Sequence, residues 1–278
     1  QLKKIEEIAA ELPALKTIVV FEAAASEAAA IEGKTLEGIR LLSLAELERS
    51  GDEHFARHPT EYEMTWPAAA PDDPATIIYT SGTTGDPKGV VLSQRNIIAN
   101  LESIISVFQF SHQDLFLSFL PLAHVYERTA GFFLPLRVGA GIAYTESLFT
   151  VDKNLREAKP TIMFCVPRLY EAFAEKLGHY AGTLSEGRRE KYLDALELAK
   201  KVGAHRGGLP GAPASGMMEK LKYKAYDGAV YSKIRERFGG RLRAFVSGGA
   251  PMAPELGALF LGLGLNLCEG YGLTETSP

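Results

Sequence analysis

The amino-acid sequence predicts an α/β fold in which largely parallel β-sheets are flanked by helices. Short apolar runs with the length of buried strands alternate with segments whose apolar residues recur at helical spacing. Such alternation favours β-α-β units and therefore a parallel sheet. The chain has 278 residues, of which 46% are hydrophobic and 23% charged, so it can bury a large core of ordinary globular composition.

Charge, hydropathy and cysteine usage exclude several classes of protein. The net charge of −4 provides no broad basic face, so we expect no nucleic-acid partner. No uncharged apolar run reaches the roughly 18 residues of a membrane span, and no charged leader precedes an apolar core as in a signal peptide. Cys165 and Cys268 lie in apolar runs, which predicts buried free thiols in a reducing compartment, the cytoplasm.

Residues 1–74 are expected to form a partial N-terminal subdomain and a connector. The expected elements are a helix over 1–12, a short buried strand over 17–21, a helix over 43–49 and a proline-rich connector over 67–74. His54 and His58 are four residues apart and could face one way on a helix, as zinc ligands do. No third ligand stands beside them, so a solvated pair is the favoured interpretation.

Residues 75–278 show a steadier alternation and are expected to form the binding core. Strands are expected over 76–80, 89–92, 115–120, 141–144, 161–166, 242–246 and 265–268. Helices are expected over 93–108, where Ser93 is a candidate cap, and over 126–136 and 151–158. The region 167–238 is expected to be mainly helical with a Gly/Pro-rich break at 205–214, and its charged end at 220–237 to be a solvated helix with a narrow apolar seam.

The segment 79–90, Tyr-Thr-Ser-Gly-Thr-Thr-Gly-Asp-Pro-Lys-Gly-Val, has the composition of a polyphosphate-binding loop. Gly82 and Gly85 allow tight turns that expose backbone N–H groups, and Lys88 adds a positive charge. The additional hydroxyl donors are Thr80, Ser81, Thr83 and Thr84. The order differs from a Walker A loop, because proline precedes Lys88 and glycine follows it. An ordinary turn between strands is the alternative.

This loop resembles the phosphate-binding signature of the adenylate-forming superfamily, which includes acyl-CoA synthetases, luciferases and peptide-synthetase adenylation domains. Three further blocks agree in the family's order: Phe-Leu-Pro-Leu-Ala-His-Val-Tyr-Glu-Arg at 119–128, Phe-Val-Ser-Gly-Gly-Ala-Pro at 245–251 and Glu-Gly-Tyr-Gly-Leu-Thr-Glu-Thr at 269–276. The wording of 119–128 and the helical insertion at 183–238 are similar to the long-chain fatty acyl-CoA synthetases. The resemblance is strong over 75–278 and weak over 1–74, and Gln94 departs from an expected histidine.

The resemblance implies a role for each block. The loop would hold the phosphates of ATP, with Lys88 as a catalytic cation. His124, together with Val125, would abut the carboxylate to be activated, although a lone histidine at such a strand end is more often structural. In the third block, Gly248 would let the acyl chain pass beside Ser247, and a flat wall against adenine would be formed by Gly249, Ala250 and Pro251.

The last block, 269–276, would close the nucleotide site. Glu269, Gly270 and Gly272 would line it, and Tyr271 would be exposed for stacking, with a buried turn tyrosine as the alternative. Thr274 would bond the α-phosphate. Glu275 would hold Mg²⁺, a hard cation that prefers oxygen ligands, and Thr80 is a second candidate near the metal.

The reaction implied by the resemblance is the activation of a long-chain fatty acid by ATP to an acyl-adenylate, followed by thioester formation with CoA. The family's ribose-binding aspartate, hinge and C-terminal lid lysine are not matched before Pro278, nor is the front of its large N-terminal domain. We therefore expect an internal piece of that domain, inactive alone, whose partners are the remaining segments of the same enzyme. A peripheral membrane contact is left open.

Two other functions are left open by the residues themselves. One is a non-catalytic nucleotide- or acyl-binding piece, and the other is a sister ligase with a different carboxylic acid. The coding sequence after Pro278 distinguishes the first from an enzyme, because a catalytic lid requires a further open reading frame.

Overall fold

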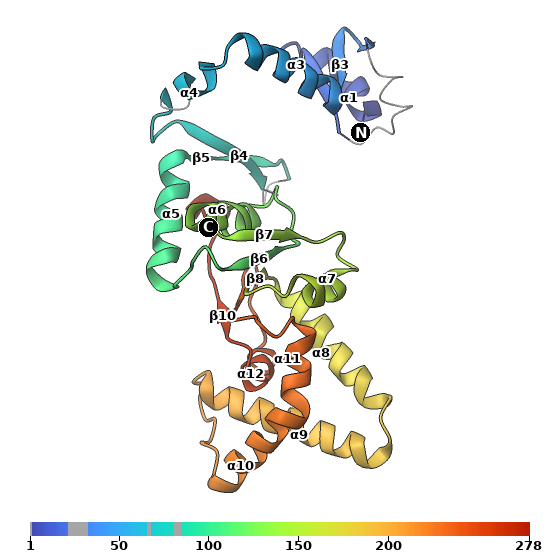
Figure 1. Cartoon of the computed structure of the whole chain (residues 1–278), viewed down its shortest axis with the longest axis vertical. Coiled ribbons are helices and arrows are strands. Elements are labelled where there is room, and N and C mark those ends of the chain that lie inside the picture. The colour runs from blue at the N-terminus through green and yellow to red at the C-terminus, as the bar shows by residue number, and fades with distance from the viewer. Residues whose placement is uncertain (1, 22–32, 66–67, 81–84) are drawn as a thin grey trace. The chain divides into compact units, whose positions relative to one another are not determined.

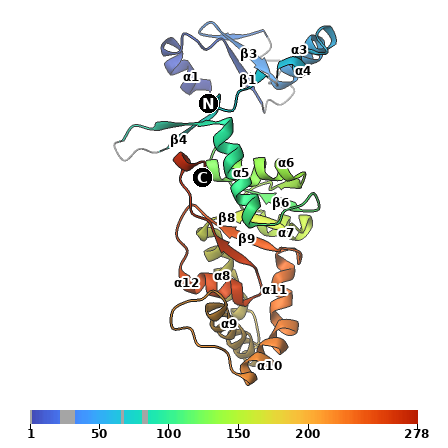
Figure 2. The same cartoon turned by 90° about the vertical axis from the view of Figure 1, so that its left-hand side faces the viewer.

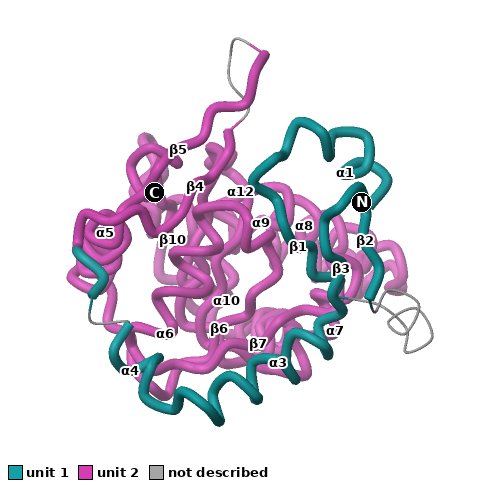
Figure 3. The backbone as a smooth tube through the Cα atoms, turned by 90° about the horizontal axis from the view of Figure 1, so that it is seen from above, with its two compact units in different colours: residues 1–70 teal, residues 71–278 magenta. Residues whose placement is uncertain are grey.

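The computed structural model describes residues 2–21, 33–65, 68–80 and 85–278. The chain divides after Ala70 into two compact units, which are described separately below (Figure 3). In the described ranges we find no helix with both the length and the apolar character needed to cross a lipid bilayer.

The first unit contains a small mixed sheet with strand order β1-β3-β2. Its elements are α1 (Leu2–Ile8), η1 (Ala9–Glu11), β1 (Thr17–Val20), β2 (Thr35–Leu36), β3 (Ile39–Ser43), α3 (Leu44–Arg57) and α4 (Glu61–Thr65). Strand β1 pairs in parallel with β3, whereas β2 and β3 form an antiparallel hairpin. The sequence analysis missed that hairpin, whose turn residues Glu37 and Gly38 both have positive φ.

The helix predicted to begin at Ser43 does so and continues further than expected. The Ser43 hydroxyl accepts a hydrogen bond from the Glu46 N–H (3.1 Å), which caps α3. The two histidines of this helix lie on its exposed surface: His54 Nε2 is 2.7 Å from a Glu61 carboxylate oxygen, and its ring stacks near that of His58.

The second unit is built on a five-stranded, wholly parallel sheet of order β10-β9-β8-β6-β7, which confirms the predicted fold class (Figure 1). The strands are β6 (Leu115–Ser118), β7 (Gly141–Tyr144), β8 (Ile162–Cys165), β9 (Ala244–Ser247) and β10 (Leu267–Glu269). All five lie within the predicted runs or within two residues of them.

Helices cover both faces of this sheet. Phe116, Ile162 and Val246 point to one face, where they pack against α5 (Gln94–Val107), the π-helical segment η3 (Glu127–Phe133) and α6 (Leu134–Val138). Met163 and Phe245 point to the other, toward α7 (Val151–Ala158), α8 (Pro167–Gly182), α9 (Glu186–Arg206), α11 (Ser232–Arg237) and α12 (Pro254–Gly262). Figures 1 and 2 show α8, α9, α11 and α12 on the opposite side of the sheet from α5 and α6.

A two-stranded antiparallel hairpin, β4 (Pro74–Thr80) and β5 (Lys88–Ser93), carries the predicted phosphate loop between its strands. The connection is too short for a parallel crossover, which needs about a dozen residues. Strand β5 leads directly into α5, whose start is fixed by reciprocal bonds between Ser93 and Asn96. The predicted Ser93 cap is therefore confirmed.

The region 167–238 differs from the prediction in two places. Its break lies at residues 207–216, and the charged stretch expected as one helix is α10 (Met217–Tyr226), a π-helical segment η4 (Asp227–Tyr231) and α11. Tyr231 and Ile234 form its buried seam. Outside this region, α12 (Pro254–Gly262) is a helix that the sequence analysis did not predict.

Helices α9 and α12 cross at two glycines. A Cβ atom built on Gly203 would lie 1.7 Å from the Ala258 carbonyl oxygen, and one on Gly262 would lie 1.8 Å from that of Ala199. No real side chain tolerates such contacts, so this crossing depends on glycine at both positions.

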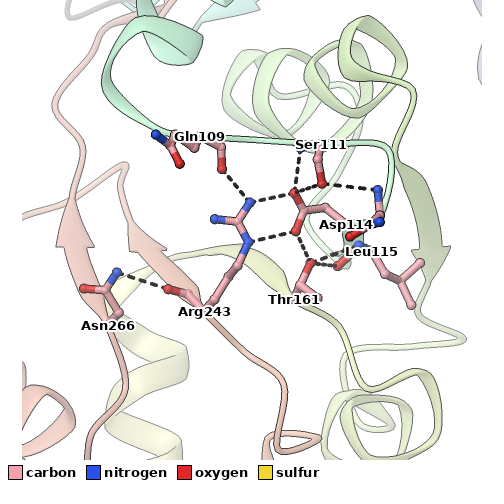
Figure 4. A network of polar contacts seen from close by, with 8 residues as sticks. Gln109, Ser111, Asp114, Leu115, Thr161, Arg243 and Asn266 are labelled. Carbon is pink, nitrogen blue, oxygen red and sulfur yellow. Dashed lines mark hydrogen bonds and ion pairs between the residues drawn. The ribbon is translucent and has the colours of Figure 1, made fainter.

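Hydrogen bonds to the Asp114 carboxylate link the amino ends of β6, β8 and β9 (Figure 4). Its carboxylate accepts bonds from Arg243 Nε and Nη2 (2.8 and 2.6 Å), from the Thr161 hydroxyl (2.7 Å) and from the Ser111 N–H (2.8 Å). The bond with Arg243 lowers the pKa of Asp114 to about 2 against the opposing effect of burial. This buried network is structural, because in parallel sheets ligands bind at the carboxyl ends of the strands.

Candidate functional site

A cavity of about 550 Å³ opens at the carboxyl edge of the parallel sheet, where three of the predicted blocks follow β6, β9 and β10. This is the edge at which open parallel sheets bind ligands. The predicted residues in its wall are Thr80, His124, Val125, Gly248, Gly249, Glu269, Gly270, Tyr271, Gly272, Thr274 and Glu275. The structure thus gathers residues from four separate stretches of sequence.

The other predicted residues lie elsewhere. Ser81, Gly82, Thr83 and Thr84 fall outside the described residues. Gly85 and Lys88 are exposed at the base of the hairpin loop, and Gly85 has a φ of 99°, which favours glycine. Ala250 and Pro251 are exposed beyond the cavity wall, whereas Ser247 is buried, with 1% of its surface exposed and no partner for its hydroxyl among the described residues.

Gly248 leaves room for a tyrosine that the sequence analysis did not single out. A Cβ atom on Gly248 would lie 2.8 Å from Cζ of Tyr126. The Tyr126 hydroxyl donates to the carbonyl oxygen of Val246 (3.2 Å), and its ring meets Phe164 edge-on at 5.8 Å. Burial raises the pKa of Tyr126 above its ordinary range, so this hydroxyl keeps its proton. The ring is held in place as part of the cavity wall.

His124 is exposed at the cavity wall, and its ring is oriented by the backbone. Its Nδ1 accepts the backbone N–H of Tyr126 at 3.2 Å. With Nδ1 acting as acceptor, Nε2 carries the ring proton and can donate a hydrogen bond. An exposed N–H donor at the end of an apolar cavity suits an anionic ligand such as a carboxylate.

The last block contributes several polar residues to the cavity wall. Tyr271 is 93% exposed, which excludes the buried turn tyrosine considered above. Glu269 is fixed by accepting the backbone N–H of Met252 (3.2 Å), and the Gly270 N–H continues the sheet by bonding the Ser247 carbonyl (2.7 Å). Glu275 is exposed at the cavity wall in the short helix η5 (Thr274–Thr276).

Glu275, Thr274 and Thr80 share the cavity wall and offer one carboxylate and two hydroxyl oxygens. Magnesium prefers oxygen and is commonly held by one or two carboxylates together with the phosphates of a substrate. These donors therefore fit a magnesium ion that arrives with a nucleotide. Within the described ranges no cluster of three or more histidine, cysteine, aspartate or glutamate side chains could hold a metal ion without such help.

The wall of the cavity also contains apolar side chains. Side chains from α5, η3 and β8 line it, and the sequence analysis did not assign them to the site; they include Ile104, Val107, Phe108, Ala130 and Phe164. The helical spacing of the α5 residues does mark an apolar face, but spacing alone cannot distinguish a face packed in the core from one that lines a cavity.

Glu127, the ninth residue of the second block, is buried, with 1% of its surface exposed. Neither carboxylate oxygen has a well-formed hydrogen bond among the described residues. Burial raises the pKa of Glu127 to about 7, and the nearby Ser118 hydroxyl and Phe119 amide only partly oppose this. The carboxyl group lies against Gly131, where a Cβ atom would be 2.3 Å from Oε1.

Arg128 connects the second block to the hairpin that carries the loop. Its Nε donates to the carbonyl oxygen of Leu122 (2.9 Å), and its Nη1 donates to the Thr76 hydroxyl on β4. The residues after His124 therefore hold the base of the hairpin beside the cavity wall.

The two cysteines differ in environment. Cys165 is buried, as predicted, and burial raises its pKa. The prediction that Cys268 is buried is wrong: it is half-buried in the edge strand β10 and lines the cavity.

A parallel α/β sheet whose carboxyl edge carries a cavity with both polar and apolar side chains in its wall defines a class of ligand-binding α/β domains. The chain matches the family described as AMP-binding enzyme over residues 2–278 and belongs to that family. It is 39% identical to the peroxisomal long chain acyl-CoA synthetase 6 of Arabidopsis thaliana over 74% of its own length, and 34% identical to a long-chain-fatty-acid–CoA ligase of Mycobacterium bovis over 83%. It spans only 28% and 38% of those two proteins.

Solved structures agree on the fold. The adenylation domain of a carboxylate reductase from Mycobacterium chelonae aligns with 98% of this chain, and 38% of that domain is covered, with a TM-score of 0.63 and 22% identity. The N-terminal domain of FACL13 from Mycobacterium tuberculosis, solved with an inhibitor, aligns with 99% of this chain and is covered over 55%, with a TM-score of 0.51 and 19% identity. The chain thus has the fold of a part of the N-terminal domain of adenylate-forming enzymes.

Proposed function

We propose that this chain supplies the nucleotide- and acyl-binding part of an enzyme that activates long-chain fatty acids with ATP and passes them to CoA. A carboxylate oxygen attacks the α-phosphorus of ATP, the bond to the β-phosphate oxygen breaks, and pyrophosphate leaves. The CoA thiol then loses its proton and attacks the acyl carbonyl, so that AMP leaves and a thioester forms. The cysteines, which form no disulfide, favour a reducing compartment such as the cytoplasm.

One observation carries this proposal: the wall of a single cavity combines apolar side chains with polar ones, His124 among them. An acyl chain would pack against Ile104, Val107 and Phe164. Its carboxylate would meet the Nε2 donor of His124, and Thr274 and Glu275 of the same wall would serve the nucleotide. A fatty acid and a nucleotide are therefore brought together at adjoining parts of one cavity, which is the alignment the reaction needs.

The two reactants are both anions, so positive charge and N–H donors must offset their repulsion. Lys88 stands at the carboxyl end of the loop and is exposed to solvent, where it can reach phosphates held by that loop. Magnesium, when bound by Glu275 and the phosphates, neutralises charge on the leaving pyrophosphate. Tyr271 offers an open aromatic face for stacking with adenine.

The test uses the chain together with the coding sequence that flanks it in its gene. Pyrophosphate release and thioester formation are measured with ATP, Mg²⁺, CoA and fatty acids of increasing length. We expect Glu275→Ala to reduce adenylation by about two orders of magnitude or more, on the scale of several kcal/mol of lost charge stabilisation. Glu190→Ala, which removes an exposed carboxylate on α9, is the matched control and should have no effect.

Substrate length is tested in the same assay. Each buried CH₂ contributes about 0.8 kcal/mol, so palmitate should be used far better than octanoate. A profile that peaks at acetate or an aromatic acid would assign the chain to a sister ligase. Binding of ATP without any acid-dependent pyrophosphate release would leave a non-catalytic binding piece instead.

A further inference from the structure

A second cavity, of about 440 Å³, lies among α8, α9, η4 and α11, and it shares no wall residue with the candidate catalytic cavity. Its volume is within the range of small-molecule sites, roughly 300–1,000 Å³. Neither the proposed reaction nor the four sequence blocks make use of it.

The wall of this cavity combines an apolar floor with a rim of positive charge. Leu177, Val230 and Ile234 form part of the floor. The charged residues in the wall are Arg188, Lys191, Lys233 and Arg237. Among the residues that the structure describes, no carboxylate lines the cavity and none of these four side chains forms an ion pair. Four positively charged side chains around one apolar cavity repel one another, and here no acidic side chain offsets that repulsion.

A buried and unpaired donor lies in the same wall. Tyr192 is 6% exposed, and its hydroxyl has no hydrogen-bond partner among the described residues. Its ring meets Tyr180 edge-on at 5.4 Å, and the Arg237 guanidinium lies 5.0 Å from the Tyr180 ring centre. Burial raises the pKa of Tyr192 to about 12, so the hydroxyl remains a proton donor. A buried donor without a partner is costly, and a bound acceptor would satisfy it.

From these features we infer that this cavity is a second binding site, for an amphipathic anion with an acyl chain and a carboxylate or phosphate head group. The chain would pack on Leu177, Val230 and Ile234. The head group would meet the cationic rim, where Arg237 offers planar two-point recognition of an oxyanion. Such a ligand can be a free acyl anion or an anionic phospholipid, and the two sources share this chemistry.

Hydrogen–deuterium exchange read by mass spectrometry tests the site region by region. The probe is dodecanoate below its critical micelle concentration, and dodecyltrimethylammonium is the control of equal length and opposite charge. We expect dodecanoate to slow exchange in peptides covering 177–192 and 227–237, and the cation to have no such effect there. Peptides covering 103–130 report separately on the candidate catalytic cavity, so failure of the proposed function and failure of this inference are distinguishable.

Two variants remove the site by different means. In the double variant Lys233→Gln with Arg237→Gln, the dodecanoate concentration that gives half of the slowing of exchange should rise by about tenfold or more for each lost charge-assisted bond. Ala229→Phe keeps all charges and fills the cavity, and it should abolish protection. Lys220→Gln with Lys224→Gln, two exposed lysines of α10 outside the cavity wall, is the control with the same charge change.

Phosphatidylcholine vesicles with and without phosphatidylglycerol separate the two sources. Protection by dodecanoate monomers assigns the site to a free acyl anion. Protection only by vesicles containing phosphatidylglycerol, lost in both site variants, assigns it to an anionic lipid. The inference would be overturned if neither dodecanoate nor the phosphatidylglycerol vesicles slowed exchange in peptides covering 177–192 and 227–237. It would also be overturned if dodecyltrimethylammonium slowed exchange there equally, or if Ala229→Phe left the slowing by dodecanoate unchanged.

Discussion

Replacing Glu127 by glutamine should change how the stability of the chain depends on pH. Burial raises the pKa of this carboxyl from its ordinary value of 4.5 to about 7. Between these two values the unfolded chain has lost the proton and the folded chain has kept it, so stability falls as pH rises. The contribution of the neutral Glu127 carboxyl to the free energy of unfolding is complete below pH 4.5 and is lost above about pH 7. A difference of about 2.5 pKa units corresponds to about 3 kcal/mol.

Urea unfolding followed by circular dichroism, at several values between about pH 4.5 and pH 8, measures this effect. The wild-type free energy of unfolding should fall by about 3 kcal/mol more than that of Glu127→Gln over this interval, because the amide cannot ionise. Glu190→Gln removes a carboxylate from the exposed face of α9 and should follow the wild type. Parallel curves for the wild type and Glu127→Gln would refute the reasoning that Glu127 is buried as a neutral acid.

Four further substitutions, one of them a control, have outcomes fixed by the geometry. Asp114→Asn should lose about 2 kcal/mol at neutral pH, the value of a pKa lowered from 3.8 to about 2; in the wild type that stability is present above pH 3.8 and is lost as pH falls toward 2, so the difference should vanish in acid. Gly203→Ala should cost about 3 kcal/mol or more in urea unfolding, whereas Gly178→Ala, with nothing within 4 Å, should gain about 0.5–1 kcal/mol. Gly248→Ala should displace Tyr126 and reduce palmitate activation in the pyrophosphate assay; unchanged kinetics would contradict its place beside the acyl chain.

The strands of the parallel sheet were predictable because each is a short apolar run bounded by turn residues. Such a run indicates a strand inside the fold even when the helices that cover it are unknown. Strand β10 shows the limit of this reasoning. Its apolar residues predict burial, but it forms the edge of the sheet beside the cavity, so Cys268 is only half-buried. The position of a strand in the sheet order is a property of the whole fold, and a local pattern does not contain it.

The residues of the candidate site also include some that the sequence predicted and some that it could not predict. Resemblance identified Thr274, Glu275 and His124 through their polar and glycine-rich blocks, and these residues do line one cavity. The resemblance could not identify the apolar side chains in the wall of that cavity, since Ile104 and Phe164 have the same residue types and spacing as core residues. A polar residue at an irregular position is an informative signal, whereas an apolar residue at a regular position is not.

The π-helical segment η3 shows why the sequence analysis, which included Glu127 in the second block, did not predict that its carboxyl group is buried. In this segment the Leu134 N–H bonds to the Thr129 carbonyl, five residues earlier, so the turn is wider than an α-helical turn. No residue type encodes that widening, so helical spacing over 126–136 predicts an ordinary α-helix there. The wider turn brings the carboxyl group of Glu127 against Gly131, whose lack of a side chain provides the space. A π-helical turn, a glycine and a buried carboxyl thus occur together immediately after His124, and rare helical widenings of this kind are frequent at functional sites. The pH dependence of Glu127→Gln therefore tests the internal support of the cavity wall as well as one carboxyl group.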